Sequence, residues 1–130
     1  MALKKPQITG KANIRPPSNS GSFDEHPIFD FQYLGNYREI PRDEKKHFID
    51  KLVVLSRLTW KEIHHSNRHQ HGFERINLNQ IRVQLVGLTE DVNQVDVFRY
   101  HEMKPMIGIR SGEVFKVMYL DYNFTAYRHD

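Results

Sequence analysis

The sequence predicts an α+β fold in which an N-terminal strand and two helices pack on a C-terminal antiparallel β-meander. Three observations support this prediction. Apolar residues at helical spacing follow Pro41, a helix-capping motif begins at Thr59, and three strand-like segments fill the last third of the chain. Helices that precede such a meander pack on one face of its sheet. We therefore expect the other face to be left for solvent or a partner.

The first strand and the first helix are indicated by a change of period. Residues 28–34 alternate aromatic and polar side chains, which is typical of a half-buried strand. Pro41 and the acidic residues after it are typical of a helix start, and apolar residues recur at helical spacing from Phe48 to Leu55. We expect a helix over about 42–57.

A second, short helix is indicated by its start. Thr59 and Glu62 have the spacing of a capping box, in which each side chain accepts a hydrogen bond from the backbone N–H of the other residue. Leu58 and Ile63 occupy the positions of a hydrophobic staple around this start. The helix is expected to begin at Thr59 and to end near 66–67.

The last third of the chain has the clearest strand patterns. They lie over residues 95–100, 105–109 and 114–119. Ser111 and Gly112 predict a tight turn between the last two strands. A final short strand is expected over 124–127. Residues 74–94 fit either a strand or an irregular packed segment, and the sequence leaves both open.

The chain has 130 residues, which fits a single domain. Residues 1–22 are rich in Pro, Gly and Ser and nearly lack large apolar side chains. They would bury too little surface to offset the entropy lost on ordering. We expect a disordered arm over 1–25 and one α+β domain over 26–130.

Composition excludes several classes of protein. No apolar run approaches the roughly 20 residues that span a bilayer, and none follows Lys4 and Lys5 as in a secretory signal. We therefore expect a cytoplasmic protein without a membrane partner. The sequence contains no cysteine, which excludes disulfides, iron–sulfur clusters and thiolate metal sites. Glycine-rich nucleotide-binding motifs and serine-hydrolase motifs are absent, so no cofactor is expected.

A histidine-rich stretch runs from His64 to His71 in a basic part of a chain whose net charge is +3. His65 and His69 have the spacing of two metal ligands on a helix face. Helix-ending residues interrupt the stretch, however, and no acid follows either histidine in the manner of a zinc-binding HExxH motif. We expect no metal site here, and a His-based metalloprotein is the third of three functional readings.

The same stretch suits a phosphate backbone. Arg68 offers a planar fork of donors and His69 a titratable donor, both of which bind phosphate oxygens. An exposed polar loop without a ligand is the simpler alternative.

Basic and aromatic residues lie on successive C-terminal strands, and a Tyr-x-His pair follows them near the end of the chain. In these features, and in two helices followed by a meander over about 28–129, the chain resembles the RelE/ParE superfamily of bacterial toxins. The resemblance implies an endoribonuclease that acts on mRNA, either free or on the ribosome. It also implies a small antitoxin protein that neutralises the toxin. The ParE branch of the superfamily acts on gyrase instead.

The resemblance also implies roles for individual residues. Arg99 and Arg110 would stabilise the charge of the phosphorane, and Tyr127 or His129 would act as acid or base, without a metal ion. The residues that would bind RNA are Lys104, Arg68 and His69.

A non-catalytic protein-interaction module is the alternative from a different functional class. It would bind its partner on the open sheet face or through the histidine-rich stretch. Alternating exposed basic residues and buried aromatic residues are then only the pattern of a half-solvated antiparallel sheet.

Overall fold

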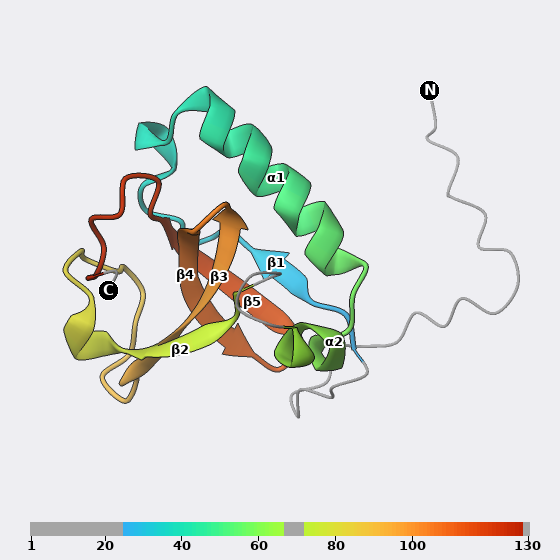
Figure 1. The fold of residues 1–130 in the computed structure, drawn as a ribbon. Coiled ribbons are helices and arrows are strands. Elements are labelled where there is room, and N and C mark those ends of the chain that lie inside the picture. Colours follow the sequence, from blue (N-terminus) through green and yellow to red (C-terminus); the bar gives the residue numbers. More distant parts are fainter. Residues whose placement is uncertain (1–24, 67–71, 129–130) are drawn as a thin grey trace, which may run out of the picture.

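A computed structural model describes residues 25–66 and 72–128 of the chain. A five-stranded mixed sheet, ordered β1-β5-β4-β3-β2, lies between a layer of helices and a layer of loops (Figure 1). The expected α+β class is confirmed. The predicted arm over 1–25 lies outside the described residues, except for Glu25.

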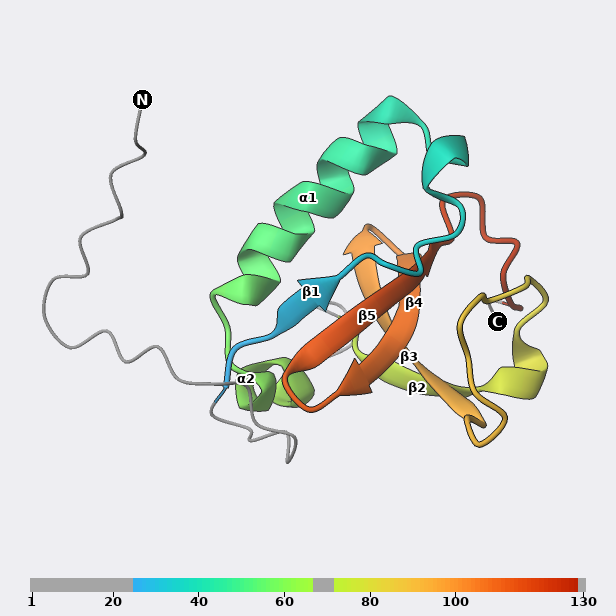
Figure 2. The same cartoon turned by 180° about the vertical axis from the view of Figure 1, so that it is seen from behind.

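The elements have the following bounds in chain order: β1 (Ile28–Asp30), the 3-10 turn η1 (Tyr37–Glu39), α1 (Arg42–Ser56), α2 (Trp60–His65), β2 (Glu74–Asn77), the 3-10 turn η2 (Leu78–Gln80), β3 (Gln94–His101), β4 (Lys104–Ser111) and β5 (Val114–Leu120). β1 pairs in parallel with β5, and Figure 2 shows the two strands side by side. The other neighbouring strands are antiparallel. Within the described parts of the chain, no helix is long and apolar enough to cross a membrane.

The first strand is shorter than the expected 28–34. Beyond Asp30 the chain turns, because the Asp30 carboxylate accepts the N–H of Gln32 at 2.9 Å and Leu34 donates its N–H to the carbonyl of Phe31 at 3.1 Å. Such local hydrogen bonds offer the backbone an alternative to strand pairing. Alternation alone could not reveal this competition.

The expected capping box opens α2. The N–H of Glu62 donates to Thr59 Oγ1 at 3.1 Å, and the N–H of Thr59 donates to Glu62 Oε1 at 3.1 Å. Trp60 and Ile63 are fully buried. The indole N–H of Trp60 donates to the carbonyl of Glu113 at 3.1 Å, which fastens α2 to the turn between β4 and β5.

Substitution Thr59→Ala is expected to lower the free energy of unfolding by about 1 kcal/mol, because the Glu62 N–H loses its partner at the helix start. Urea denaturation followed by circular dichroism measures this change. Thr59→Ser keeps the hydroxyl and serves as the control, with stability close to that of the wild type. Equal stability of Thr59→Ala and the wild type would contradict the capping role.

The sheet carries a hydrophobic cluster on each face. The cluster under the helices includes Leu55, Trp60, Ile63, Phe98, Met106 and Phe115. The cluster on the opposite face consists of Ile76, Val95, Val97, Ile107, Ala126 and Tyr127. The expectation of an open second face is therefore wrong, because two loop segments cover part of it.

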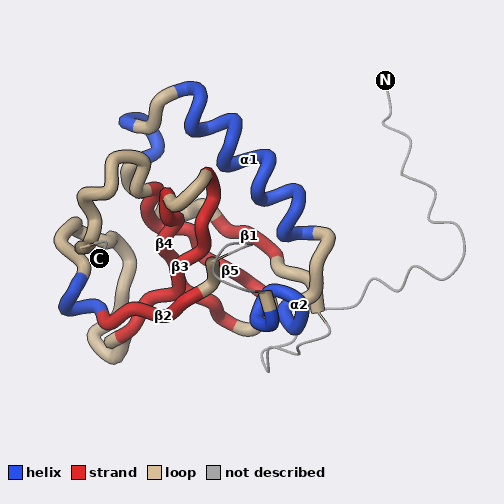
Figure 3. The backbone as a smooth tube through the Cα atoms, viewed as in Figure 1, coloured by secondary structure: helices blue, strands red, loops and turns tan. Residues whose placement is uncertain are grey.

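These two segments are 78–92 and the chain after β5, drawn as neighbouring loops in Figure 3. The N–H of Arg82 donates to the carbonyl of Ala126 at 2.7 Å and joins them. Apolar side chains between Leu78 and Leu85 pack against the second cluster without forming a strand or a helix beyond η2. Of the two possibilities for 74–94, a strand holds for β2 and an irregular packed segment for the residues after it.

The final strand expected over 124–127 does not form. The buried carboxylate of Asp121 accepts the N–H groups of Thr125 at 2.7 Å and Ala126 at 3.1 Å. These N–H groups would be needed for strand pairing, so the segment folds as a turn around Asp121.

Candidate functional site

A cleft of about 690 Å³ opens beside the second cluster, on the face of the sheet opposite the helices. Its walls come from β2, β3, the β3–β4 turn and the segment after β5. The lining residues are Glu74, Arg75, Ile76, Asn77, Gln80, Gln94, Arg99, Met103, Phe124, Tyr127 and Arg128. We call this feature the Arg99 cleft.

Arg99 forms the centre of the cleft and is only 5% exposed. Its Nη1 donates to the hydroxyl of Tyr127 at 2.7 Å, and its Nη2 donates to Glu74 Oε1 at 2.7 Å. The guanidinium therefore joins β2, β3 and the C-terminal segment. Its Nε is buried and has no hydrogen-bond partner among the described residues. Buried donors without a partner are rare in native proteins, so this one calls for a functional or structural explanation.

The two partners of Arg99 differ in protonation and access. Burial raises the pKa of the Tyr127 phenol, and the hydrogen bond from Arg99 offsets part of that rise. The phenol is therefore protonated at neutral pH and can act as a donor. Glu74 keeps 36% of its side chain exposed, so a ligand that enters the cleft can reach this carboxylate.

The sequence-predicted site contains Arg99 and Tyr127, and the structure brings these two together. Glu74 is not among the residues predicted from the sequence, because its segment fits either a strand or an irregular packed segment. The pattern Glu74–Asn77 is too short for periodicity to decide, although its single buried residue, Ile76, marks the face that Glu74 shares.

Arg110 lies on the other face of the sheet, and the expectation that it acts beside Arg99 is wrong. Across β3 and β4, Phe98 pairs with Met106 and Asp96 with Gly108, so even-numbered residues share the helix-covered face. Arg99 is odd-numbered and points the other way.

On the helix-covered face, the guanidinium of Arg110 lies over the Trp60 ring at 4.1 Å from its centroid. Its Nη1 is 3.0 Å from His64 Nε2. Burial and, next, the charge of Arg110 lower the pKa of His64, so a neutral His64 accepts this hydrogen bond. Arg110 thus fastens α2 to the end of β4.

Lys104, which is expected from the sequence to bind RNA, forms an ion pair with Glu44 of α1. Glu44 also accepts a hydrogen bond from the Tyr100 hydroxyl at 2.9 Å and lies 3.3 Å from His101 Nδ1. We call these four residues the Glu44 cluster. Burial alone would raise the pKa of Glu44, but hydrogen bonds from Lys104, Tyr100 and His101 outweigh it and hold the pKa below its ordinary value.

The Glu44 cluster depends on an irregularity in β3. The register of the pairing between β3 and β4 shifts between Arg99 and His101, which is typical of a β-bulge. In a regular strand, consecutive side chains point to opposite faces. The bulge lets Tyr100 and His101 reach the same carboxylate, while Arg99 still points into the cleft.

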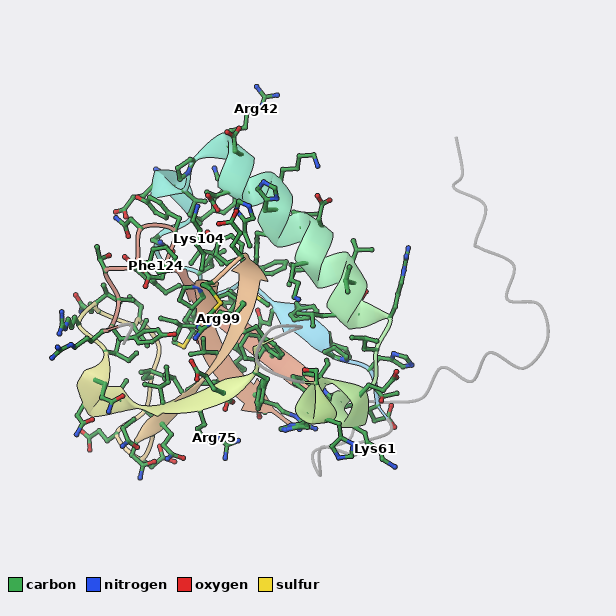
Figure 4. All side chains as sticks on the ribbon, viewed as in Figure 1. Arg42, Lys61, Arg75, Arg99, Lys104 and Phe124 are labelled. Atoms are coloured by element: carbon green, nitrogen blue, oxygen red, sulfur yellow. The ribbon has the colours of Figure 1, made fainter. Side chains whose placement is uncertain are left out.

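Three sequence-predicted residues, Arg68, His69 and His129, lie outside the described residues. Over 25–66 and 72–128, no group of three or more His, Asp or Glu side chains is placed to hold a metal ion. Arg75 is paired with Asp96 at 3.0 Å and projects outward from β2 in Figure 4, whereas Arg99 lies inside.

Comparison with protein-family models, with curated proteins and with solved structures found no match for this chain.

Proposed function

We propose that the chain is a RelE/ParE-like, toxin-type endoribonuclease whose active site is the Arg99 cleft. The observation that carries this proposal is the convergence of a carboxylate, a buried guanidinium and a protonated phenol, from Glu74, Arg99 and Tyr127, in one cleft. The substrate is mRNA, free or on the ribosome, and the site of action is the cytoplasm. A small antitoxin protein is the proposed inhibitor.

The three side chains fit the needs of RNA cleavage by the neighbouring 2′-hydroxyl. A general base removes the proton of that hydroxyl, a bond forms from its oxygen to phosphorus, and the bond to the 5′-oxygen breaks. In this scheme Glu74 is the base, and Tyr127 donates a proton to the departing 5′-oxygen. Arg99 supplies positive charge where the phosphorane becomes more negative. The products are a 2′,3′-cyclic phosphate and a free 5′-hydroxyl.

The edge of the cleft supports binding of a polyanion. Arg128 lines it together with Arg99 and is exposed. Arginine side chains at such an edge attract the phosphate backbone independently of sequence.

Induced expression and RNA digestion test this proposal with the full chain. The wild type is expected to arrest growth when induced alone. RNA digestion is run once with ribosomes and once without them, and the wild type is expected to cleave RNA in at least one of these two formats. The fragments should end in 2′,3′-cyclic phosphate, and a 2′-deoxy substitution at the cleaved position should block the reaction. Normal growth together with intact RNA in both formats would refute the proposal.

A non-catalytic interaction module is the second candidate, and an apolar groove favours it. The groove lies between α1 and the segment after β1, and it is lined by Phe31, Leu34, Tyr37, Lys45, Phe48 and Ile49. Phe31, Tyr37 and Ile49 are exposed there. Exposed apolar surface of this kind marks contacts with other proteins. A chain that leaves both growth and RNA unaffected would favour this candidate.

A further inference from the structure

Phe124, at the edge of the Arg99 cleft, has an unusual backbone conformation. Its φ angle is 57°, in the left-handed region that bulky L-residues rarely adopt. Its side chain is also 43% exposed. Residues in such conformations persist only where the surroundings hold them, and they gather at functional sites.

The surroundings of Phe124 provide that hold. Asp121 is fully buried and accepts hydrogen bonds from the two residues that follow Phe124, at 2.7 Å and 3.1 Å. The N–H of Asp121 itself donates to the carbonyl of Pro105 on β4 at 2.9 Å. Asp121 therefore fixes the turn to the sheet, and Phe124 is presented at a set position relative to Arg99.

The position of Phe124 suits a flat apolar ligand. Phe124 and Met103 line the same cleft as Arg99, and Met103 is 39% exposed on the β3–β4 turn. In Figure 4, Phe124 lies on the segment after β5. An exposed ring and a flexible thioether beside buried charge match the two parts of a nucleotide, the base and the phosphate.

We propose that Phe124 is the stacking platform of a nucleobase-binding subsite for single-stranded RNA, with Met103 completing its apolar surface. The proposal rests on the RNA-cleaving function above and adds the strand state of the substrate. A base can stack on Phe124 only when it is not stacked within a duplex, so double-stranded RNA does not fit the subsite. Stacking accepts any base, so the subsite tolerates sequence.

Binding of a short, fluorescent 2′-O-methyl oligonucleotide tests the subsite without cleavage, because its 2′-oxygen cannot attack. Phe124→Ala is expected to weaken binding about tenfold, as measured by anisotropy, and Phe124→Trp is expected to retain it. Tyr37→Ala removes an exposed aromatic residue from the α1 groove and is the matched control, with unchanged binding. The wild type should bind the same sequence more weakly as a duplex.

A third variant separates the effect of losing the aromatic ring from an effect on the stability of the fold. Phe124→Gly removes the ring but suits the positive φ, so it should unfold at or above the temperature at which Phe124→Ala unfolds, and bind equally weakly. A glycine variant is usually less stable than the alanine variant at the same position. A Phe124→Gly variant that is at least as stable as Phe124→Ala would therefore show that the backbone at residue 124 is strained.

The outcomes distinguish the subsite from the catalytic function. A wild type that cleaves RNA, with Phe124→Ala binding and cleaving equally well, overturns the subsite and leaves the catalytic function intact. A wild type that binds the oligonucleotide through Phe124 but cleaves nothing overturns the catalysis and supports the subsite. Equal affinity for single-stranded and duplex RNA overturns the subsite.

Discussion

Glu74→Gln is expected to reduce RNA cleavage by about 10²–10⁴-fold, the usual loss when a general base is removed. Glutamine retains a carbonyl oxygen that can accept the hydrogen bond from Arg99 Nη2, so the cleft keeps its shape. It cannot remove the proton of the 2′-hydroxyl at neutral pH. The rate constant for a single turnover on a defined RNA measures this loss.

Two further variants make this result specific. Glu39→Gln removes an exposed carboxylate in η1, and its cleavage rate should equal that of the wild type. Glu74→Gln should unfold at a lower temperature than the wild type, because the buried Arg99 loses its counter-charge, but it should stay folded at the assay temperature, which separates lost chemistry from lost structure. If an active wild type and Glu74→Gln cleave at the same rate, the base is another residue, and His129 is the next to test.

The elements with strong local signals could be predicted from the sequence. The helix expected over 42–57 is α1, and the box at Thr59 starts α2 as its spacing requires. The three strand patterns of the last third became β3, β4 and β5. Gly112, with φ of 63°, makes the turn expected between the last two. In each case the local preference and the packed fold agree, which is why periodicity was enough.

The layer of loops could not be predicted in this way. Between Leu78 and Leu85 the apolar side chains pack on the sheet without a regular period. Neither the helical spacing nor the strand alternation of apolar residues therefore detects them. The segment 124–127 has strand-like composition, but the carboxylate of Asp121 takes the N–H groups that a strand would use. A distant or competing partner decided the conformation in both regions.

The candidate site shows the same division. Arg99 and Tyr127 were identified through a resemblance, and they meet because the C-terminal segment folds back over β3. Arg110 was misplaced because its face relative to Arg99 depends on the β-bulge in β3, which the sequence pattern does not indicate. A two-residue turn at Glu102 and Met103 pairs His101 with Lys104, and a regular continuation of that register would place residues 99 and 110 on the same face. The β-bulge between Arg99 and His101 shifts the register and so separates them by face.

The cleft is supported from behind by the Glu44 cluster. Arg99 and Tyr100 are adjacent in β3 but point to opposite faces, toward the cleft and toward Glu44 respectively. The ion pair of Glu44 with Lys104 ties α1 to the β3–β4 hairpin next to Arg99. The hairpin therefore has a fixed end on the helix-covered face while it presents Arg99 on the other.

Glu44→Ala is expected to lower the free energy of unfolding by roughly 3 kcal/mol, since removing one partner leaves a largely buried cation without its counter-charge. Lys104 keeps 20% of its side chain exposed, which places the loss at the lower end of the range for buried pairs. Asp50→Ala is the matched control on the same helix. It breaks the exposed pair with Lys46 and should cost no more than about 0.5 kcal/mol. Equal losses for the two variants would contradict a buried role for Glu44.

The contribution of Glu44 should also depend on pH. The pKa of Glu44 is lower in the folded chain than in the unfolded chain, where a glutamate has a pKa of about 4.3. Its stabilising effect is therefore fully present above that pH, and it is lost as the pH falls through the folded-state pKa. Urea denaturation at pH 7 and pH 3 should show the wild type losing more stability than Glu44→Gln, which has no carboxyl group to protonate at this position. A stability difference between wild type and Glu44→Gln that stays constant from pH 7 to pH 3 would show that the carboxylate charge does not stabilise this fold.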